Sequence, residues 1–204
     1  MSPGALWCAS ATGRAGAAAA VVFGLLSAVA APQLQAQIRG VVVEDARPGR
    51  PAPNLILPYV TAAGVGAEPY ELRLELGRVV VLAFCPQLGG GGCLDLWRTW
   101  GRAESPFGDD VSLVGISGDS ASVALAVVGR EGWGGRFLTD LRGREGRRWG
   151  VPPGDGVAVF VVGPEGRVAY RDLQFRLLDS GSQAALQGGI QAARRSSGGG
   201  DRVP

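Results

Sequence analysis

The fold of this chain is decided by residues 78–97, RVVVLAFCPQLGGGGCLDLW. The apolar, β-branched run at residues 78–86 is typical of a strand that is buried on both faces of a sheet. After four glycines, a leucine and two tryptophans recur at three-residue spacing, which predicts an amphipathic helix from Cys93 to Ala103. The stretch therefore predicts a buried strand that ends near one cysteine, Cys85, and a helix that begins at another.

Elements of both kinds alternate along the rest of the chain. Short apolar runs predict the strands, and helix-capping residues followed by helical spacing predict the helices. The predicted strands are residues 54–58, 111–117, 136–140 and the hairpin 157–173, and the predicted helices are residues 119–130, 144–149 and 179–194. We therefore expect one α/β domain over residues 52–194, with a central mixed β-sheet flanked by helices.

The N-terminal part of the chain has the composition of a targeting segment. Arg14 precedes the apolar run of residues 15–31, and small residues that suit cleavage follow at Ala30 and Ala36. The run is at the short end for a membrane span, which needs roughly 17–25 apolar residues. Residues 1–36 are therefore predicted to be a signal peptide or an N-terminal membrane anchor, and the protein to be exported to a periplasmic or other extracytoplasmic location.

Export bears on the three cysteines. Cys8 lies inside the predicted leader, so only Cys85 and Cys93 belong to the folded domain. An oxidising compartment allows such a pair to be structural or redox-active. Between leader and domain, residues 37–51 predict a short strand and a linker, and the polar, glycine-rich residues 195–204 predict a disordered tail.

The composition excludes several kinds of site. The chain has no histidine, and all 20 of its basic residues are arginine. Serine–histidine–aspartate and cysteine–histidine catalysis and histidine-ligated metal sites need an imidazole, whereas Schiff-base chemistry and phosphate-binding Walker loops need lysine. A net charge of only +2 gives no indication of a nucleic-acid partner. Thiol, carboxylate or arginine chemistry remains, or no chemistry.

Six motifs follow one another between residues 52 and 172. They are APNLILP (52–58), LGRVVVLAFCP (76–86), LVGISGDS (113–120), FLTD (137–140), RRWGV (147–151) and VFVVGPEGRVAYR (159–171). Each motif is weak alone, but the ordered set resembles the peroxiredoxin (AhpC/TSA) family, a branch of the thioredoxin-like fold. The resemblance implies a thioredoxin-like domain over this part of the chain.

The resemblance also implies an activity and a site. Cys93 lies seven residues after Pro86, which is the family's spacing to its peroxide-reducing cysteine. Cys93 would then be the nucleophile for hydrogen peroxide or an organic hydroperoxide, and Pro86 would shield its thiolate. Electrons would come from a thiol reductant, either a thioredoxin-like protein or a small thiol, or from Cys85. No metal or organic cofactor is implied, and the resemblance does not fix the oligomeric state.

Two positions depart from the family's pattern. The hydroxyl residue expected three positions before the cysteine is Gly90, and the expected arginine is Val157. Loss of one preorganised donor can lower a rate on the order of a hundredfold. Arg98, Arg147 and Arg148 are candidates to replace the missing arginine in space.

Cys93 and Cys85 also have simpler interpretations. Cys93 can be an inert, small hydrophobic residue. Cys85 lies within a strand and is expected chiefly to fill the core, with a resolving role after local unfolding as the alternative. A structural Cys85–Cys93 disulfide requires Cα atoms within about 7 Å.

The rival function is a catalytically attenuated thioredoxin-fold module that binds a partner or acts as a redox sensor at the cell envelope. Burial of the Cys93 sulfur among apolar groups favours this module, and a nearby guanidinium favours the enzyme.

Overall fold

The structure, a computed structural model, describes residues 46–102 and 105–197. The chain divides into two units, Met1–Ile38 and Arg39–Pro204, and every described residue belongs to the second. The predicted leader, residues 1–36, lies outside the described residues, as does its cysteine. Within the described part of the chain, no helix has both the length and the apolar character that a membrane span requires.

Nine strands in the described residues form two sheets. The strands are β1 (Ile56–Leu57), β2 (Tyr59–Thr61), β3 (Gly64–Val65), β4 (Tyr70–Glu71), β5 (Val79–Cys85), β6 (Val111–Ser117), β7 (Arg136–Thr139), β8 (Val157–Val162) and β9 (Val168–Phe175). β1 pairs with β4, and the other seven form one sheet in the order β3-β2-β7-β6-β5-β8-β9. β5, β6 and β7 run parallel, whereas β8 is antiparallel to β5. The predicted mixed sheet is confirmed.

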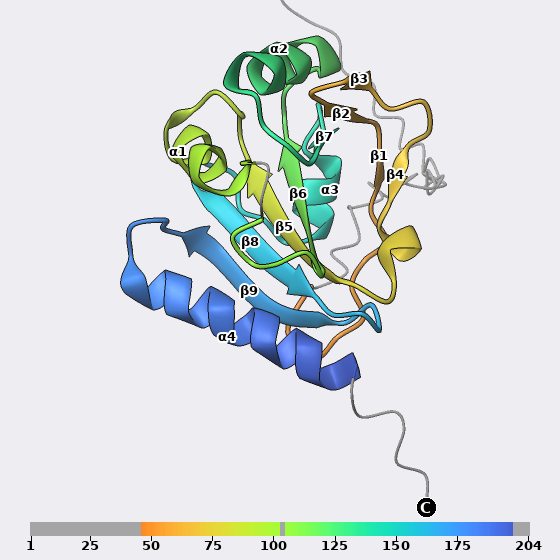
Figure 1. The fold of residues 1–204 in the computed structure, drawn as a ribbon, viewed down its shortest axis with the longest axis vertical. Coiled ribbons are helices and arrows are strands. Elements are labelled where there is room, and N and C mark those ends of the chain that lie inside the picture. The colour runs from red at the N-terminus through yellow and green to blue at the C-terminus, as the bar shows by residue number, and fades with distance from the viewer. Residues whose placement is uncertain (1–45, 103–104, 198–204) are drawn as a thin grey trace, which may run out of the picture. The chain divides into compact units, whose positions relative to one another are not determined.

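One 3₁₀ helix and four α-helices connect the strands of the described residues. They are the 3₁₀ helix η1 (Leu72–Glu75), α1 (Gly91–Trp100), α2 (Ala121–Glu131), α3 (Arg144–Arg148) and α4 (Ser180–Ser197). The predicted helices correspond to α1, α2, α3 and α4. The sequence did not predict β2, β3, β4 or η1, all of which lie between residues 59 and 75. Figure 1 shows α4 running along β8 and β9.

β5 is buried along its whole length and separates two hydrophobic clusters. Its odd-numbered residues, which include Cys85, join buried side chains of α1, α2 and α4. Its even-numbered residues, which include Phe84, join a second cluster with Trp149 and Phe160. Because successive side chains of a strand point to opposite faces, Cys85 and Phe84 serve opposite sides of the sheet. The strand predicted to be buried on both faces is confirmed.

Two boundaries of the sequence-based domain division need correction. Residues 46–51 belong to the folded unit rather than to a linker, because Ala46 is fully buried and Gly49 N–H donates to the carbonyl of Val168. α4 continues to Ser197, so residues 195–197 are helical rather than part of the predicted tail. The polar serines and arginines at the end of α4 concealed the helix, because their composition resembles that of a disordered segment.

Two adjacent glycines in α4 provide a matched test of how closely this helix packs on β9. A Cβ atom added to Gly189 would approach Tyr170 Cβ within clash distance, whereas one added to Gly188 would meet nothing within 4 Å. We expect Gly189→Ala to destabilise the fold by about 1–3 kcal/mol through overpacking. Gly188→Ala should stabilise it by about 0.5–1 kcal/mol, because alanine favours a helix interior over glycine. Urea unfolding of the two variants measures both values, and equal effects would contradict the close packing.

Candidate functional site

The two cysteines of the domain form a disulfide bond. Cys85 is the last residue of β5, and Cys93 is the third residue of α1. Their Cα atoms are 5.9 Å apart, within the range for a disulfide. The bond coexists with the first turn of α1, since Cys93 is helical in the disulfide-bonded structure. Closing a loop of this size contributes about 2–4 kcal/mol to folding stability.

The loop that the disulfide closes is attached to the neighbouring β6–α2 connection. The backbone N–H of Leu88 donates to Asp119 Oδ2 at 2.7 Å, and Gly118 N–H donates to the carbonyl of Pro86 at 3.2 Å. The side chain of Leu88 is fully buried. The N-cap of α2 is Ser120, whose Oγ accepts from Val123 N–H. Asp119 instead holds the cysteine loop in place.

The four-glycine run is only partly a loop. Gly90 is the N-cap of α1, and residues 91 and 92 already belong to its first turn. The contacts of Leu88 fix the part of the loop that precedes the glycines. Glycine in a helical turn nevertheless gives up more conformational entropy than other residues. The start of α1 is therefore the part of the site most easily rearranged when the disulfide is reduced.

Both sulfur-bearing side chains are shielded from water. Cys93 is 3% exposed and Cys85 is 6% exposed, and both pack in one apolar cluster with Leu88, Leu96 and Ala124. The start of a helix favours a thiolate, because its unpaired N–H groups carry positive potential. Burial among apolar groups opposes this effect, because it disfavours the charged form. Burial of the Cys93 sulfur among apolar groups is the feature expected of a partner-binding module, so it favours that function over the enzyme.

The two departures from the peroxiredoxin pattern are also visible in the structure. Gly90 gives α1 no side-chain cap. Val157 is the first residue of β8, where it is buried and pairs with Phe175. Neither position supplies a hydrogen-bond donor from a side chain. The site therefore lacks two groups that the resemblance would place beside Cys93.

The three candidate replacement arginines have other positions. Arg98 lies on α1 and pairs with Glu131 at the end of α2, at 3.0 Å. Arg148 donates to the carbonyl of Asn54 and pairs with Glu145. Arg147 lines a cavity on the side of the sheet to which Phe84 points. The structure therefore offers no support for Arg98 or Arg148 as the missing group.

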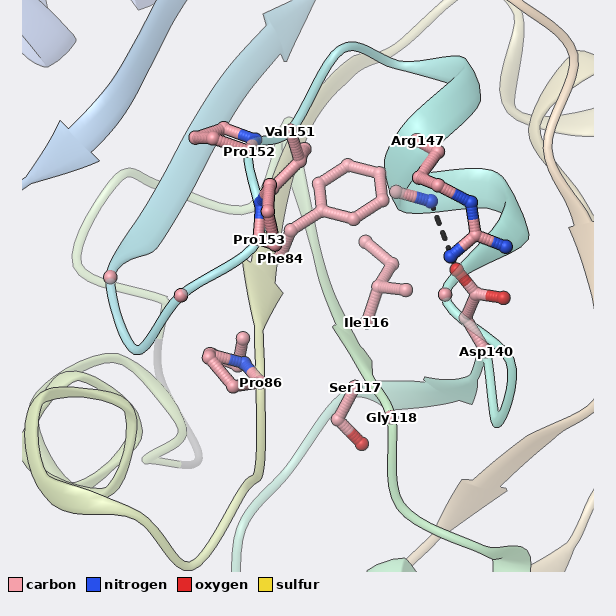
Figure 2. Close-up of a pocket in the computed structure, with 15 residues that line it drawn as sticks. Phe84, Pro86, Ile116, Ser117, Gly118, Asp140, Arg147, Val151, Pro152 and Pro153 are labelled. Carbon is pink, nitrogen blue, oxygen red and sulfur yellow. Dashed lines mark hydrogen bonds between the residues drawn. The ribbon is translucent and has the colours of Figure 1, made fainter. Parts of the chain in front are cut away.

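A cavity of about 320 Å³ lies where Pro86 follows β5. Its lining includes the side chains of Phe84, Ile116 and Val151, and the residues of the segment that leads into β8. Figure 2 shows Arg147 and Asp140 on one side of the cavity and Pro86, Pro152 and Pro153 on the other. Cys85 also borders it, but Cys93 does not. Pro86 thus lies between the disulfide loop and a cavity that the sequence did not predict.

Two consecutive prolines before β8 are the feature of the sequence that could have indicated this cavity. Val151, Pro152 and Pro153 precede β8, and two consecutive prolines restrict the backbone directly before a buried strand. A rigid connection at the carboxyl end of an α/β sheet is a common wall of a binding crevice. Among the described residues, no group of three or more histidine, cysteine, aspartate or glutamate side chains could hold a metal ion.

Comparison with known proteins shows the fold. No protein-family model matches the sequence, and no curated protein matches it either. AhpC of Enterococcus faecalis has a TM-score of 0.60 and 16% identity, over 76% of this chain and 96% of that chain. A protein described as the thiol:disulfide interchange protein DsbE, from Chlorobium tepidum, also has a TM-score of 0.60, with 21% identity, over 73% of this chain and 99% of that chain.

A third similar structure comes from a protein described as having alkyl peroxide reduction activity. It is the bacterioferritin comigratory protein of Xanthomonas campestris, with a TM-score of 0.57 and 20% identity. The match covers 67% of this chain and 92% of that chain. The described residues therefore have the thioredoxin-like fold of the peroxiredoxins, and the resemblance drawn from the motifs is confirmed at the level of the fold.

Proposed function

We propose that the protein is a thiol–disulfide oxidoreductase that reduces hydrogen peroxide or organic hydroperoxides through Cys93, with Cys85 as the resolving cysteine. The observation that carries the proposal is the Cys85–Cys93 disulfide at the junction of β5 and α1. Open α/β sheets place their sites at the carboxyl ends of strands. Similarity to peroxiredoxin structures and to a thiol:disulfide interchange protein supports redox chemistry at this position.

The proposed reaction has three balanced steps. The Cys93 thiolate attacks the terminal oxygen of ROOH, the O–O bond breaks, and the products are Cys93 sulfenic acid and RO⁻, which takes up a proton to give ROH. The Cys85 thiol then attacks the Cys93 sulfur, which forms the disulfide and releases water. Two thiol groups of a reductant, either a thioredoxin-like protein or two small thiols, reduce the disulfide and are themselves oxidised to a disulfide.

The proposal includes an exported location. The leader composition of residues 1–36 supports it, and a disulfide persists in oxidising compartments such as the periplasm. The peroxide chemistry needs no metal or organic cofactor, since a thiolate alone can cleave an O–O bond. We expect the rate to be lower than in sites that retain the hydroxyl and arginine donors, because each such donor can contribute on the order of a hundredfold.

Stopped-flow mixing tests the proposal directly. The full chain is reduced, freed of excess reductant and mixed with hydrogen peroxide or cumene hydroperoxide, while peroxide loss and free thiol content are followed. One equivalent of peroxide should be consumed as two thiols disappear, because the disulfide is the product. Loss of the protein thiols no faster than the loss of free cysteine thiol in the same buffer would contradict the proposal.

Replacing Gly90 with serine sharpens this test. A Cβ at Gly90 would lie 3.5 Å from the carbonyl oxygen of Gln87, which is an ordinary contact, so a side chain fits there. A serine at the N-cap can also accept from the N–H of the third helical residue, which is Cys93. We expect Gly90→Ser to raise the peroxide rate constant by about tenfold or more, since it restores a donor beside the thiol. An unchanged rate constant would show that the missing hydroxyl does not limit this site.

The second candidate function is the thioredoxin-fold module that binds a partner, with the disulfide as a structural clamp. Burial of both cysteines favours it, because a clamp needs no access from solvent. The two functions differ in how the oxidised protein reacts with thiols. An oxidoreductase disulfide opens in a mild excess of glutathione or dithiol, whereas a structural disulfide resists it until the protein unfolds. Alkylation of the released thiols, followed by mass measurement, separates the two.

A further inference from the structure

The cavity beside Pro86 borders Cys85 but not Cys93, the proposed site of peroxide attack. Most of its apolar lining, such as Phe84 and Ile116, belongs to the cluster on one side of the sheet, whereas Cys93 belongs to the cluster on the other side. The volume of the cavity, about 320 Å³, is at the lower end for small-molecule sites, which range from about 300 to 1,000 Å³.

The walls of the cavity are mainly apolar, and its polar side chains are those of Ser117, Asp140 and Arg147. Phe84, Ile116, Val151 and the two prolines of residues 152–153 provide the apolar surface. Phe84 is held rigidly, because its ring packs against those of Trp149, at 5.7 Å, and Phe160, at 5.5 Å, in the core behind it. A preformed apolar wall of this size fits one ring or a short hydrocarbon chain.

Two charged side chains line the cavity, those of Asp140 and Arg147, and they differ in their hydrogen bonding. Both carboxylate oxygens of Asp140 are bonded, to the backbone N–H groups of Arg144 and Gly146, each at 2.9 Å. Arg147 is exposed, and its guanidinium makes no hydrogen bond or ion pair with any residue that the structure describes. Figure 2 shows Arg147 and Asp140 on the same side of the cavity. The available polar group is therefore a cation with several N–H donors.

We propose that this cavity binds a small monocarboxylate whose apolar part fills the pocket and whose carboxylate pairs with Arg147. The planar fork of a guanidinium matches a carboxylate with two parallel hydrogen bonds. The charge of Asp140 lies close by and disfavours a second negative charge on the ligand, so a monoanion fits better than a phosphate dianion. The adjacent exposed Arg144 adds to the attraction for an anion.

Calorimetric titration of the oxidised full chain tests this site without any turnover, so its outcome is independent of whether Cys93 reduces peroxides. The probe is 3-phenylpropionate, and its neutral control is 3-phenylpropanamide, which has nearly the same shape. We expect saturable binding of the acid, at least about tenfold tighter than that of the amide, because a charge-assisted pair is lost with the carboxylate.

Three variants locate the site. Arg147→Gln should weaken binding of the acid by about tenfold or more, to the level of the amide, because it removes the charged donor. Arg142→Gln is the matched control: Arg142 is exposed and does not line the cavity, so the affinity should stay within about twofold. Gly146→Leu should abolish binding, because a Cβ at Gly146 would point toward Phe84 and Val151, at 4.0 and 3.9 Å.

Several outcomes overturn the proposal. These are equal affinity for acid and amide, an Arg147→Gln affinity like that of the unchanged protein, retained binding by Gly146→Leu, or no saturable binding up to about 10 mM acid. Thermal unfolding of Gly146→Leu controls for its fold. The Cβ atom of the new side chain meets only ordinary contact distances, the rest of the side chain would extend into the cavity, and the change replaces a glycine within α3, so we expect its Tm to be equal or higher.

Discussion

Replacing Cys93 with serine is expected to abolish hydroperoxide reduction, with a loss on the order of a thousandfold or more, as when a nucleophile is removed from other enzymes. A serine hydroxyl at this position is too weak a nucleophile to cleave the O–O bond. Cys85→Ser should behave differently, because Cys93 would still react with the first molecule of peroxide. Cys85 is the disulfide partner of Cys93, with 5.9 Å between their Cα atoms, and without it the sulfenic acid cannot close the disulfide. Catalytic turnover should therefore stop after the first equivalent of peroxide has oxidised Cys93.

The two variants are compared by stopped flow and by intact-protein mass after reaction. Cys85→Ser should gain one oxygen atom on Cys93 and then further oxygen in excess peroxide, since sulfenic acid proceeds to sulfinic acid. Cys93→Ser should gain none. The assignment of roles is wrong if Cys85→Ser is inert while Cys93→Ser consumes one equivalent, because Cys85 would then be the nucleophile. Far-UV circular dichroism of both variants controls for loss of fold.

Trp97→Ala is expected to remove about 3–5 kcal/mol of folding stability, which is a large share of the roughly 5–15 kcal/mol of an ordinary domain. Trp97 is 1% exposed, and its ring packs against Phe137 at 4.7 Å. Backbone also approaches it closely: a Cβ added to Gly115 would lie 2.8 Å from Trp97 Cζ2. The rings of Trp100 and Trp133 also pack against it, so the space left by alanine would be bounded by bulky aromatic neighbours.

A phenylalanine at the same position provides the matched control. The indole Nε1 of Trp97 is buried without a hydrogen-bond partner among the described residues. Trp97→Phe therefore removes an unpaired donor while keeping much of the ring, and we expect a loss of about 1–2 kcal/mol. Leu178→Ala, at a side chain that is 96% exposed, should change stability by less than about 0.5 kcal/mol. Equal losses for Trp97→Ala and Trp97→Phe in urea unfolding would contradict this packing.

The sequence predicted the longer strands of the sheet. β5 is a continuous apolar run that is buried throughout, and β6, which includes two serines and a glycine, has the bounds predicted for the strand at residues 111–117. The segment between residues 59 and 75 was missed, because β2, β3 and β4 contain only two or three residues each. Such short strands show no measurable alternation of apolar and polar residues. Their pairing is fixed by partners such as β7 that lie far along the chain.

For the candidate site, the sequence predicted the position of the cysteines but not the state of their environment. Spacing placed Cys93 at the start of a helix, which α1 confirms. It could not show that Asp119 bonds Leu88 N–H, because the two residues come together only when β5 and β6 pair. The sequence also could not distinguish the surroundings of neighbouring arginines. Arg147 and Arg148 are adjacent in sequence, yet Arg147 lines a cavity and Arg148 contacts Asn54.

The short span of the disulfide has a consequence for how the protein matures. Cys85 and Cys93 are eight residues apart, and β5 and α1 are consecutive elements, so the thiols meet once a single turn of chain has formed. Closing so small a loop is fast compared with assembling the distant pairs of the sheet. The bond joins no remote segments and thus does not direct the topology. We infer that pairing of Cys85 with Cys93 does not constrain the order in which the strands of the sheet assemble.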